Sequence, residues 1–292
     1  MAVPGAVVAI VLVAAVLHVT WNTLVKLSSD GYLATVLIAA AGAVLCGAVL
    51  PFLPSMHAAA WINVAGSVAL QSLYYPLVAA TYCAGDMSQT YPLMRGSAPL
   101  LVALLAGPLI GERLDVAQWA GVLLICAGIL AMALRRRPVG PVPKEPSRRS
   151  SRPSRATGLA LLTAVVIAAY TVVDGVGSRA SGAPVTYTAW IFLFTAVPML
   201  VVAVTRSRRA LLELARRQWW LALIGGPANV GAYGLVLVAV TRAPVASVAA
   251  LRETSILFAT VVARFVLKER VDRYRVGGTV LIAVGAVVLR SS

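Results

Sequence analysis

The sequence predicts an all-α, polytopic membrane protein, and three observations carry this prediction. Of the 292 residues, 60% are hydrophobic and 12% are charged, whereas charged residues make up about a quarter of an ordinary soluble domain. Apolar runs of about 20 residues, the helix length that crosses the hydrocarbon core, recur along the chain. No segment alternates with the period of two that membrane β-strands need, so the spans are expected to be helices.

Ten such runs are expected to be transmembrane helices. In order, they lie at residues 4–26, 31–53, 59–81, 87–110, 116–134, 157–178, 184–205, 218–241, 244–266 and 273–290. Prolines inside them remove backbone hydrogen bonds and are expected to bend the helices. The bends are expected at Pro76, Pro92, Pro99, Pro108, Pro198 and Pro227.

The stretch from Thr90 to Gly128 returns 157 residues later with its spacing preserved. Arg95, Glu112, Arg113, Asp115, Gly121 and Gly128 correspond to Arg252, Glu269, Arg270, Asp272, Gly278 and Gly285. The chain therefore divides into a first repeat, 1–134, and a second repeat, 157–292, joined by a basic Pro/Ser/Arg-rich segment, 135–156, expected to be a flexible linker. Because each repeat has five spans, an odd number, the second enters the membrane the opposite way round, as an inverted repeat.

The basic residues predict the orientation. Eighteen of the 25 Lys and Arg residues fall in loops on the side of the linker, and four fall in loops on the other side. The positive-inside rule therefore places the linker in the cytoplasm and both termini outside. We attribute the formal charge of +15 to this asymmetry, and we expect the linker to contact anionic lipid rather than nucleic acid.

Polar side chains inside the spans recur at matched positions in the two repeats, which predicts that they line one central cavity. In the first repeat they are His18, Trp21, Asn22, Gln71 and Tyr75, and in the second Tyr170, Asp174, Asn229 and Tyr233. A packing interpretation stays open for each, because a polar residue in a span usually bonds a neighbouring helix, at about 0.6 kcal/mol. Lys26 and Ser178, on the same stripes as His18 and Asp174, are expected near a membrane face.

Arg95 and Arg252 lie eight to nine residues inside their spans, about 12 to 14 Å deep. An unpaired guanidinium there would cost at least about 2.5 to 3.5 kcal/mol. A salt bridge to Glu253 or Asp174 would offset this cost, and so would a substrate carboxylate or phosphate. Both interpretations are compatible if the substrate competes with the internal partner for the guanidinium. Glu253, Asp174 and His18 are the candidates for proton coupling.

The two E-R-x-D corners are expected to be structural. Their acidic residues, Glu112 and Asp115 in the first repeat, are expected to cap helices, and the glycine pairs of each repeat should let neighbouring helices approach closely. A membrane-embedded enzyme acting on a lipid-linked substrate is the alternative, but these corners lack the His or Cys partners that catalysis would need. A flippase or a nonconducting receptor fits the spans, but explains the duplicated polar set less directly.

Several motifs resemble the EamA-type transporters of the drug/metabolite transporter superfamily. They are HVTWNTLVK, YPLMRGSAPLL, GERLD, AALRETSILFA and KERVD. The resemblance covers nearly the whole chain and implies a carrier of the bacterial inner membrane, often an exporter of amino acids, metabolites or drugs, with no bound cofactor. By position it implies cavity residues at His18, Trp21, Asn22, Tyr91, Arg95, Arg252 and Glu253.

Two departures from that pattern matter. The first span has no acidic residue, whereas the small multidrug branch uses a glutamate there, which argues against export of cationic drugs. Ten-span relatives generally have both termini in the cytoplasm, opposite to the orientation that the basic residues predict here, and we keep the latter. We therefore expect a secondary active transporter, not an enzyme, that selects a small anionic or zwitterionic metabolite through Arg95 and Arg252.

Overall fold

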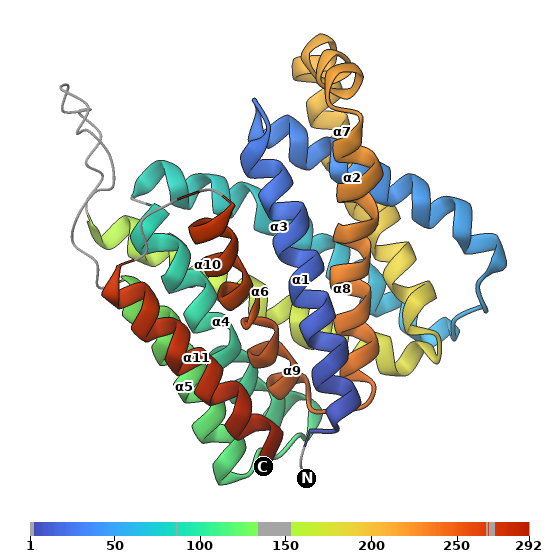
Figure 1. Cartoon of the computed structure of the whole chain (residues 1–292). Coiled ribbons are helices and arrows are strands. Elements are labelled where there is room, and N and C mark those ends of the chain that lie inside the picture. The colour runs from blue at the N-terminus through green and yellow to red at the C-terminus, as the bar shows by residue number, and fades with distance from the viewer. Residues whose placement is uncertain (1–2, 86, 134–152, 267, 269–271, 292) are drawn as a thin grey trace. The chain divides into compact units, whose positions relative to one another are not determined.

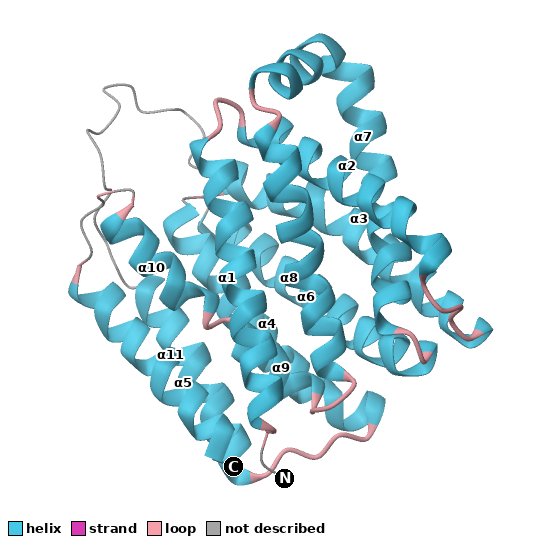
Figure 2. Ribbon diagram, turned by 45° about the vertical axis from the view of Figure 1, so that its right-hand side comes forward, coloured by secondary structure: helices cyan, strands magenta, loops and turns pink. Residues whose placement is uncertain are grey.

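The computed structural model describes residues 3–85, 87–133, 153–266, 268 and 272–291, and the regular structure of these residues is helical (Figures 1 and 2). In chain order the elements are α1 (Gly5–Leu27), α2 (Gly31–Val49), η1 (Leu50–Phe52), η2 (Ala58–Ala60), α3 (Trp61–Ala84), α4 (Met87–Ile110), α5 (Val116–Ala133), α6 (Pro153–Ser181), α7 (Pro184–Arg217), η3 (Leu221–Gly225), α8 (Gly226–Val240), α9 (Val245–Arg252), α10 (Ser255–Phe265) and α11 (Arg273–Ser291). The predicted all-α fold is confirmed. Most of the predicted linker lies outside the described residues, but its last four residues begin α6.

Eight helical stretches in the described part of the chain are long and apolar enough to cross a membrane, so the protein is a multi-pass membrane protein. Two of the ten predicted spans fall short of that standard. α3 is 24 residues long, but Asn63, Ser67, Gln71 and Ser72 lower the hydropathy of its first half. α5 is apolar, but its described apolar stretch, Val116–Met132, is shorter than the other spans.

The predicted span at 244–266 is interrupted in the middle. α9 ends at Arg252 and α10 begins at Ser255. Between them the backbone N–H groups of Glu253 and Thr254 donate to carbonyls three residues back, at 3.0 Å each. Such a tightened turn inside a helix often marks a functional hinge. The sequence interpretation missed this break because the run is apolar on both sides of it.

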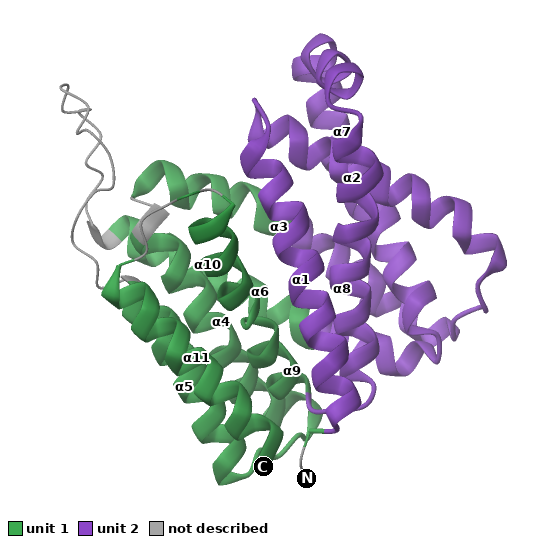
Figure 3. Cartoon of the chain, viewed as in Figure 1, with its two compact units in different colours: residues 1–3, 73–172, 245–292 green, residues 4–72, 173–244 purple. Residues whose placement is uncertain are grey.

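The helices form two compact units, each built from both sequence repeats (Figure 3). Unit 1 comprises Met1–Val3, Leu73–Val172 and Val245–Ser292, and unit 2 comprises Pro4–Ser72 and Val173–Pro244. α3 and α6 each contribute one part to each unit. The two units therefore interleave the repeats, and the division of the chain at the linker stays a prediction from the sequence.

In unit 1, α5 and α11 pack along each other in antiparallel directions, and glycines from both helices make the contact. A Cβ added at Gly121 would lie 3.0 Å from the carbonyl oxygen of Gly285, and one added at Gly128 would lie 2.7 Å from that of Gly278. Such close backbone approach is possible only without a side chain. The expected packing role of these glycines is confirmed.

In unit 2, α2 packs against α7 and α1 packs against α8. Ser178 is fully buried, and its Oγ donates to the carbonyl of Leu237 at 2.8 Å. Ser178 therefore fastens α6 to α8, three residues before α6 ends at Ser181; its place near a membrane face stays a prediction. The neighbouring Arg179 donates from Nε to the Val240 carbonyl at 2.8 Å and from Nη2 to the Ala243 carbonyl at 2.9 Å, which satisfies carbonyls at the end of α8.

Apart from the break between α9 and α10, the helices among the described residues are irregular at one predicted place and at one unpredicted place. A π-helical turn, η3, ends at Gly225, directly before Gly226 and Pro227, where the missing proline N–H removes a helical bond. The non-helical backbone inside α7 is at Ser207, with φ −146° and ψ 33°, although Pro198 also lies in that helix. The chain thus bends where α7 has passed its apolar part.

Candidate functional site

An ion pair in unit 1 joins the buried arginine of α4 to the break between α9 and α10. Arg95 Nη2 lies 3.1 Å from Glu253 Oε1. Arg95 is 8% exposed and Glu253 is 4% exposed. Of the partners expected for a buried Arg95, the structure selects Glu253, and the membrane cost of the guanidinium is thereby offset.

The break presents Glu253 to Arg95. α9 ends at Arg252, and the next residue, Glu253, donates its backbone N–H to the carbonyl of Ala250, three residues back, instead of continuing the α-helix. Arg252 itself is half-buried and lies within electrostatic range of the Glu253 carboxylate. The carboxylate is thus flanked by both repeat-related arginines, although it is Arg95 that makes the ion pair.

The ion pair leaves hydrogen-bonding atoms unused. Among the described residues, Arg95 Nε and Glu253 Oε2 are buried and make no hydrogen bond, and Arg95 Nη2 has only its contact with Glu253 Oε1. Buried donors and acceptors are nearly always bonded, because an unsatisfied one costs about 1–3 kcal/mol and more when charged. The pair therefore offers unfilled donors beside an unfilled acceptor, in a form that a bound molecule with both kinds of group can satisfy.

Tyrosines surround this pair within unit 1. The ring of Tyr74 contacts that of Tyr75 at 5.5 Å between centroids and that of Tyr170 at 6.1 Å, both edge to face. Tyr74, Tyr91 and Tyr170 lie within electrostatic range of the Arg95 guanidinium. Edge-to-face contacts hold such rings in fixed orientations, so the ion pair has an aromatic surrounding rather than a purely aliphatic one.

A second polar cluster, in unit 2, is centred on Asp174 of α6, which is fully buried. Tyr187 of α7 donates to Asp174 Oδ1 at 2.9 Å. Tyr233 of α8 donates to Oδ2, and Gln71 of α3 donates to the same oxygen at 3.4 Å. The Gln71 amide also donates to Ser67 Oγ at 2.9 Å. One carboxylate thereby ties four helices together through neutral donors.

The predicted polar stripe of α1 also lies in unit 2, and contacts within α1 involve His18, Trp21 and Asn22. The rings of His18 and Trp21 pack edge to face with centroids 5.4 Å apart. Asn22 is exposed, and its amide donates to the His18 carbonyl at 2.7 Å. The Trp21 Nε1–H is buried without a hydrogen-bond partner in the described part of the chain. On α8, Asn229 is half-buried.

The structure thus sorts the predicted site residues into two groups. Unit 1 holds Tyr75, Tyr91, Arg95, Tyr170, Arg252 and Glu253, and unit 2 holds His18, Trp21, Asn22, Gln71, Asp174, Asn229 and Tyr233. That all of them line one cavity stays a prediction. Two residues were missed: Tyr74, which the Tyr-Tyr pair in the sequence could have revealed, and Tyr187, which stands at the start of a span where tyrosine is common anyway.

The acidic corner between α4 and α5 has a structural role, as expected. Both carboxylate oxygens of Glu112 accept the backbone N–H of Val245, at 3.0 and 2.8 Å, which caps the start of α9. Asp115 Oδ1 accepts the N–H of Gln118 at 2.7 Å, and the Gln118 side chain accepts the N–H of Asp115 at 3.1 Å. This reciprocal cap starts α5. Asp272, the counterpart of Asp115, likewise accepts the N–H of Arg275 at 2.9 Å at the start of α11, and Glu269, the counterpart of Glu112, lies outside the described residues.

Comparisons with known proteins agree with this architecture. Residues 155–291 match the family model of the EamA-like transporter family. Curated proteins gave no match. Solved structures gave 29 matching chains; one, titled "Crystal structure of protein", is 20% identical, covers 97% of this chain and 96% of its own, and has a TM-score of 0.72. At that identity the likeness concerns the fold, which the two chains share over almost their full lengths.

Proposed function

Because residues 155–291 belong to the EamA-like transporter family, we propose that this multi-pass membrane transporter is a secondary active carrier of a small zwitterionic or anionic metabolite, working as an exporter. The observation that carries the substrate assignment is the buried pair of Arg95 and Glu253, with its unfilled donors and acceptor. A bound substrate that satisfies these atoms gains hydrogen bonds without the cost of stripping water from exposed charges.

A zwitterion fits this pair better than an anion does. A carboxylate bound to Arg95 alone would place a second negative charge beside Glu253, and like charges in a buried site disfavour each other strongly. An ammonium group on the same molecule would instead pair with Glu253 Oε2 while the carboxylate binds Arg95 Nε. Arg252 adds a second guanidinium near Glu253, so a monoanion is the second candidate.

Alternating access is supported by the packing of α5 with α11. Residues 157 apart are equivalent in the two repeats, so Gly278 is the equivalent of Gly121 and Gly285 that of Gly128. Gly121 contacts Gly285, and Gly128 contacts Gly278. Such reciprocal contacts are the mark of a two-fold relation, and antiparallel equivalent helices imply opposite insertion. This supports our proposal of ten spans in two inverted repeats that rock about a central cavity.

The charges of unit 2 support the proposed orientation. The end of unit 2 where α1 and α7 finish carries Lys26 and the exposed arginines at 206, 208, 209, 216 and 217, whereas the opposite end carries Arg179 and Arg242. Ser28 Oγ donates to Gln218 Oε1 at 2.8 Å, which fixes the two helix ends together. By the positive-inside rule the basic end is cytoplasmic, so the start of α1 faces outward across a bacterial inner membrane.

The substrate class is tested by transport into proteoliposomes containing the purified full-length chain. The panel holds zwitterionic, anionic, cationic and neutral metabolites of matched size. We expect saturable uptake of zwitterions above the rate of protein-free vesicles, weaker uptake of anions, and none of cations. Uptake of anions alone would contradict the zwitterion assignment. If the protein neither binds nor takes up any metabolite of the panel, the transport proposal is contradicted.

We propose that Asp174 carries a coupling proton, with Glu253 and His18 as the other candidates. Tyr187, Tyr233 and Gln71 donate to Asp174 as neutral groups. Asp174 can therefore bind and release a proton without breaking an ion pair, whereas Glu253 is paired with Arg95. If an exporter exchanges substrate for protons, an acidic vesicle lumen accelerates uptake. The Asp174→Asn variant is expected to take up substrate at the same rate with and without that gradient.

Tyr187→Phe is the matched control for Asp174→Asn. It removes one hydrogen bond from the same carboxylate, which lowers the free energy of unfolding by about 1–3 kcal/mol, but it leaves the carboxylate able to bind a proton. The gradient should still accelerate uptake by this variant. A gradient response that survives in Asp174→Asn would assign the proton to another group.

A further inference from the structure

The last third of α7 is a separate amphipathic segment. α7 has 34 residues, about 51 Å of helix, whereas the hydrocarbon core is about 30 Å thick. The backbone leaves the helical conformation at Ser207, and Figure 1 shows the chain changing direction beyond this part of α7. Residues 208–217, called here the surface segment, therefore continue past the span rather than through it.

The surface segment is held at the level where spans end. It follows a span that begins at Pro184 and precedes one that begins at Leu221, so both of its ends return to the same membrane face. Leu211 and Leu214 are buried in a cluster with Leu33, Ala34 and Ile38 of α2. The hydrogen bond from Ser28 to Gln218 fixes its far end to the corner between α1 and α2.

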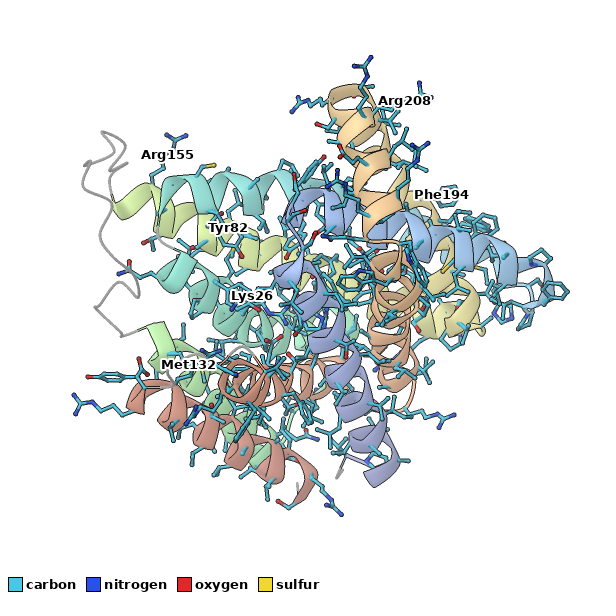
Figure 4. The ribbon with its side chains drawn as sticks, turned by 45° about the horizontal axis from the view of Figure 1, so that its top comes forward. Lys26, Tyr82, Met132, Arg155, Phe194 and Arg208 are labelled. Carbon is cyan, nitrogen blue, oxygen red and sulfur yellow. The ribbon has the colours of Figure 1, made fainter. Side chains whose placement is uncertain are left out.

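The exposed side of the surface segment is strongly basic. Arg208, Arg209, Arg216 and Arg217 are exposed, as is Arg206 just before the segment. The segment's acidic residue, Glu213, lies 2.7 Å from Arg217. Figure 4 shows Arg208 at the tip of α7, directed away from the helices of its unit. Guanidinium groups bind phosphate oxygens in pairs, so the charge of this surface fits an array of phosphodiesters.

Apolar side chains are exposed beside the arginines. Leu212 is 50% exposed and Trp219 is 61% exposed. Tryptophan at the end of a span marks the boundary between headgroups and acyl chains. Leu212 lies four residues from both Arg208 and Arg216, so it shares their face of the helix, and Trp219 follows two residues after the helix ends at Arg217. Long arginine side chains reach headgroups while leucine and tryptophan on the same side meet the acyl-chain boundary.

We propose that the surface segment is an in-plane helix that binds the headgroups of anionic phospholipids, with Leu212 and Trp219 entering the acyl-chain boundary. This site is independent of the substrate site in unit 1 and of the linker. Each arginine near an anionic surface contributes about a fivefold gain in lipid affinity. The segment thereby fixes the ends of α7 and α8 to the leaflet that carries the negative charge.

The test measures binding of short-chain phosphatidylglycerol and phosphatidylcholine to the purified full-length protein in a neutral detergent. Arg209→Gln/Arg216→Gln removes two exposed guanidinium groups, and we expect phosphatidylglycerol affinity to fall about 30-fold while phosphatidylcholine affinity is unchanged. Arg242→Gln/Arg290→Gln removes the same charge from two exposed arginines elsewhere and should leave both affinities unchanged. A monodisperse elution profile verifies that each variant is folded.

Two further outcomes decide the proposal. An equal loss in both double variants would mean that total charge, not this surface, governs lipid binding, and would overturn it. The second outcome is that an oligonucleotide, at equal charge concentration, displaces phosphatidylglycerol from the unchanged protein but does not bind Arg209→Gln/Arg216→Gln. That result would assign the surface to nucleic acid and would also overturn the proposal. Quenching by lipids brominated on their acyl chains should fall in Trp219→Phe relative to the unchanged protein, since this removes the tryptophan proposed to enter the boundary.

Discussion

Replacing Glu253 with glutamine is expected to lower the free energy of unfolding by about 3–5 kcal/mol and to stop transport. The reason is that Arg95 and Arg252 both lie near this carboxylate, so its loss leaves the buried Arg95 guanidinium without its ion-pair partner and removes a negative charge near Arg252. Arg95→Gln should cost less, because Arg252 still accompanies Glu253. Denaturant unfolding in detergent measures the difference between the two single variants.

The double variant Arg95→Gln/Glu253→Gln separates stability from function. It removes the charge pair as a unit, and replacing a buried pair by neutral groups is often nearly neutral for stability, so most of the loss in Glu253→Gln should be recovered. Transport should remain abolished, because the remaining Arg252 cannot replace the paired Arg95 and Glu253 that are proposed to bind the two charges of the substrate. The variant Arg95→Gln/Arg252→Gln should likewise insert and fail to transport; full transport by it would refute the proposed site.

Substituting leucine for Gly128 is expected to prevent the folding of unit 1. A Cβ there would lie 2.7 Å from the Gly278 carbonyl oxygen and 2.9 Å from Ile282 Cγ1, both closer than real Cβ contacts, and neither backbone can retreat without separating α5 from α11. Overpacking of this kind costs about 1–3 kcal/mol for small increments, and leucine adds three carbons beyond Cβ. Monodisperse protein recovered after extraction is the measurement.

Gly277→Leu is the matched control for this variant. Gly277 is adjacent to Gly278 on α11, but a Cβ added there meets nothing within 4 Å. The same substitution on the same helix should therefore leave the yield unchanged. Equal losses in Gly128→Leu and Gly277→Leu would mean that glycine's effect on the helix backbone, rather than the contact between α5 and α11, decides folding.

Features controlled by spacing and by the cost of burial were predictable. The glycine pairs seven apart lie on one helix face, so their packing role followed from the helical period. The depth of Arg95 required a carboxylate nearby, and few acidic residues occur inside the spans, so Glu253 was one of two partners named. The caps at Asp115 and Glu112 followed from acidic side chains standing where an apolar run begins.

Features that depend on tertiary contacts were not predictable. The break after Arg252 leaves the hydropathy of the run unchanged, and only the pairing of Glu253 with Arg95 shows why the helix turns there. The spacing of Tyr170 and Asp174 predicted one stripe, but α6 runs through both units, and the two side chains join different clusters. Asn22 has a local bond to its own helix, which residue spacing does not reveal.

α9 has a mechanical consequence, because both of its ends are attached to α4 or its corner. At one end the Glu112 carboxylate holds the N–H of Val245, and at the other Glu253 holds Arg95. The eight residues of α9 form a short helix about 12 Å long between these two attachments. If a substrate binds the Arg95 guanidinium as we propose, the attachment at Glu253 is released while the one at Val245 remains. α9 could then pivot about Val245, and the change at the ion pair would reach the corner after α4.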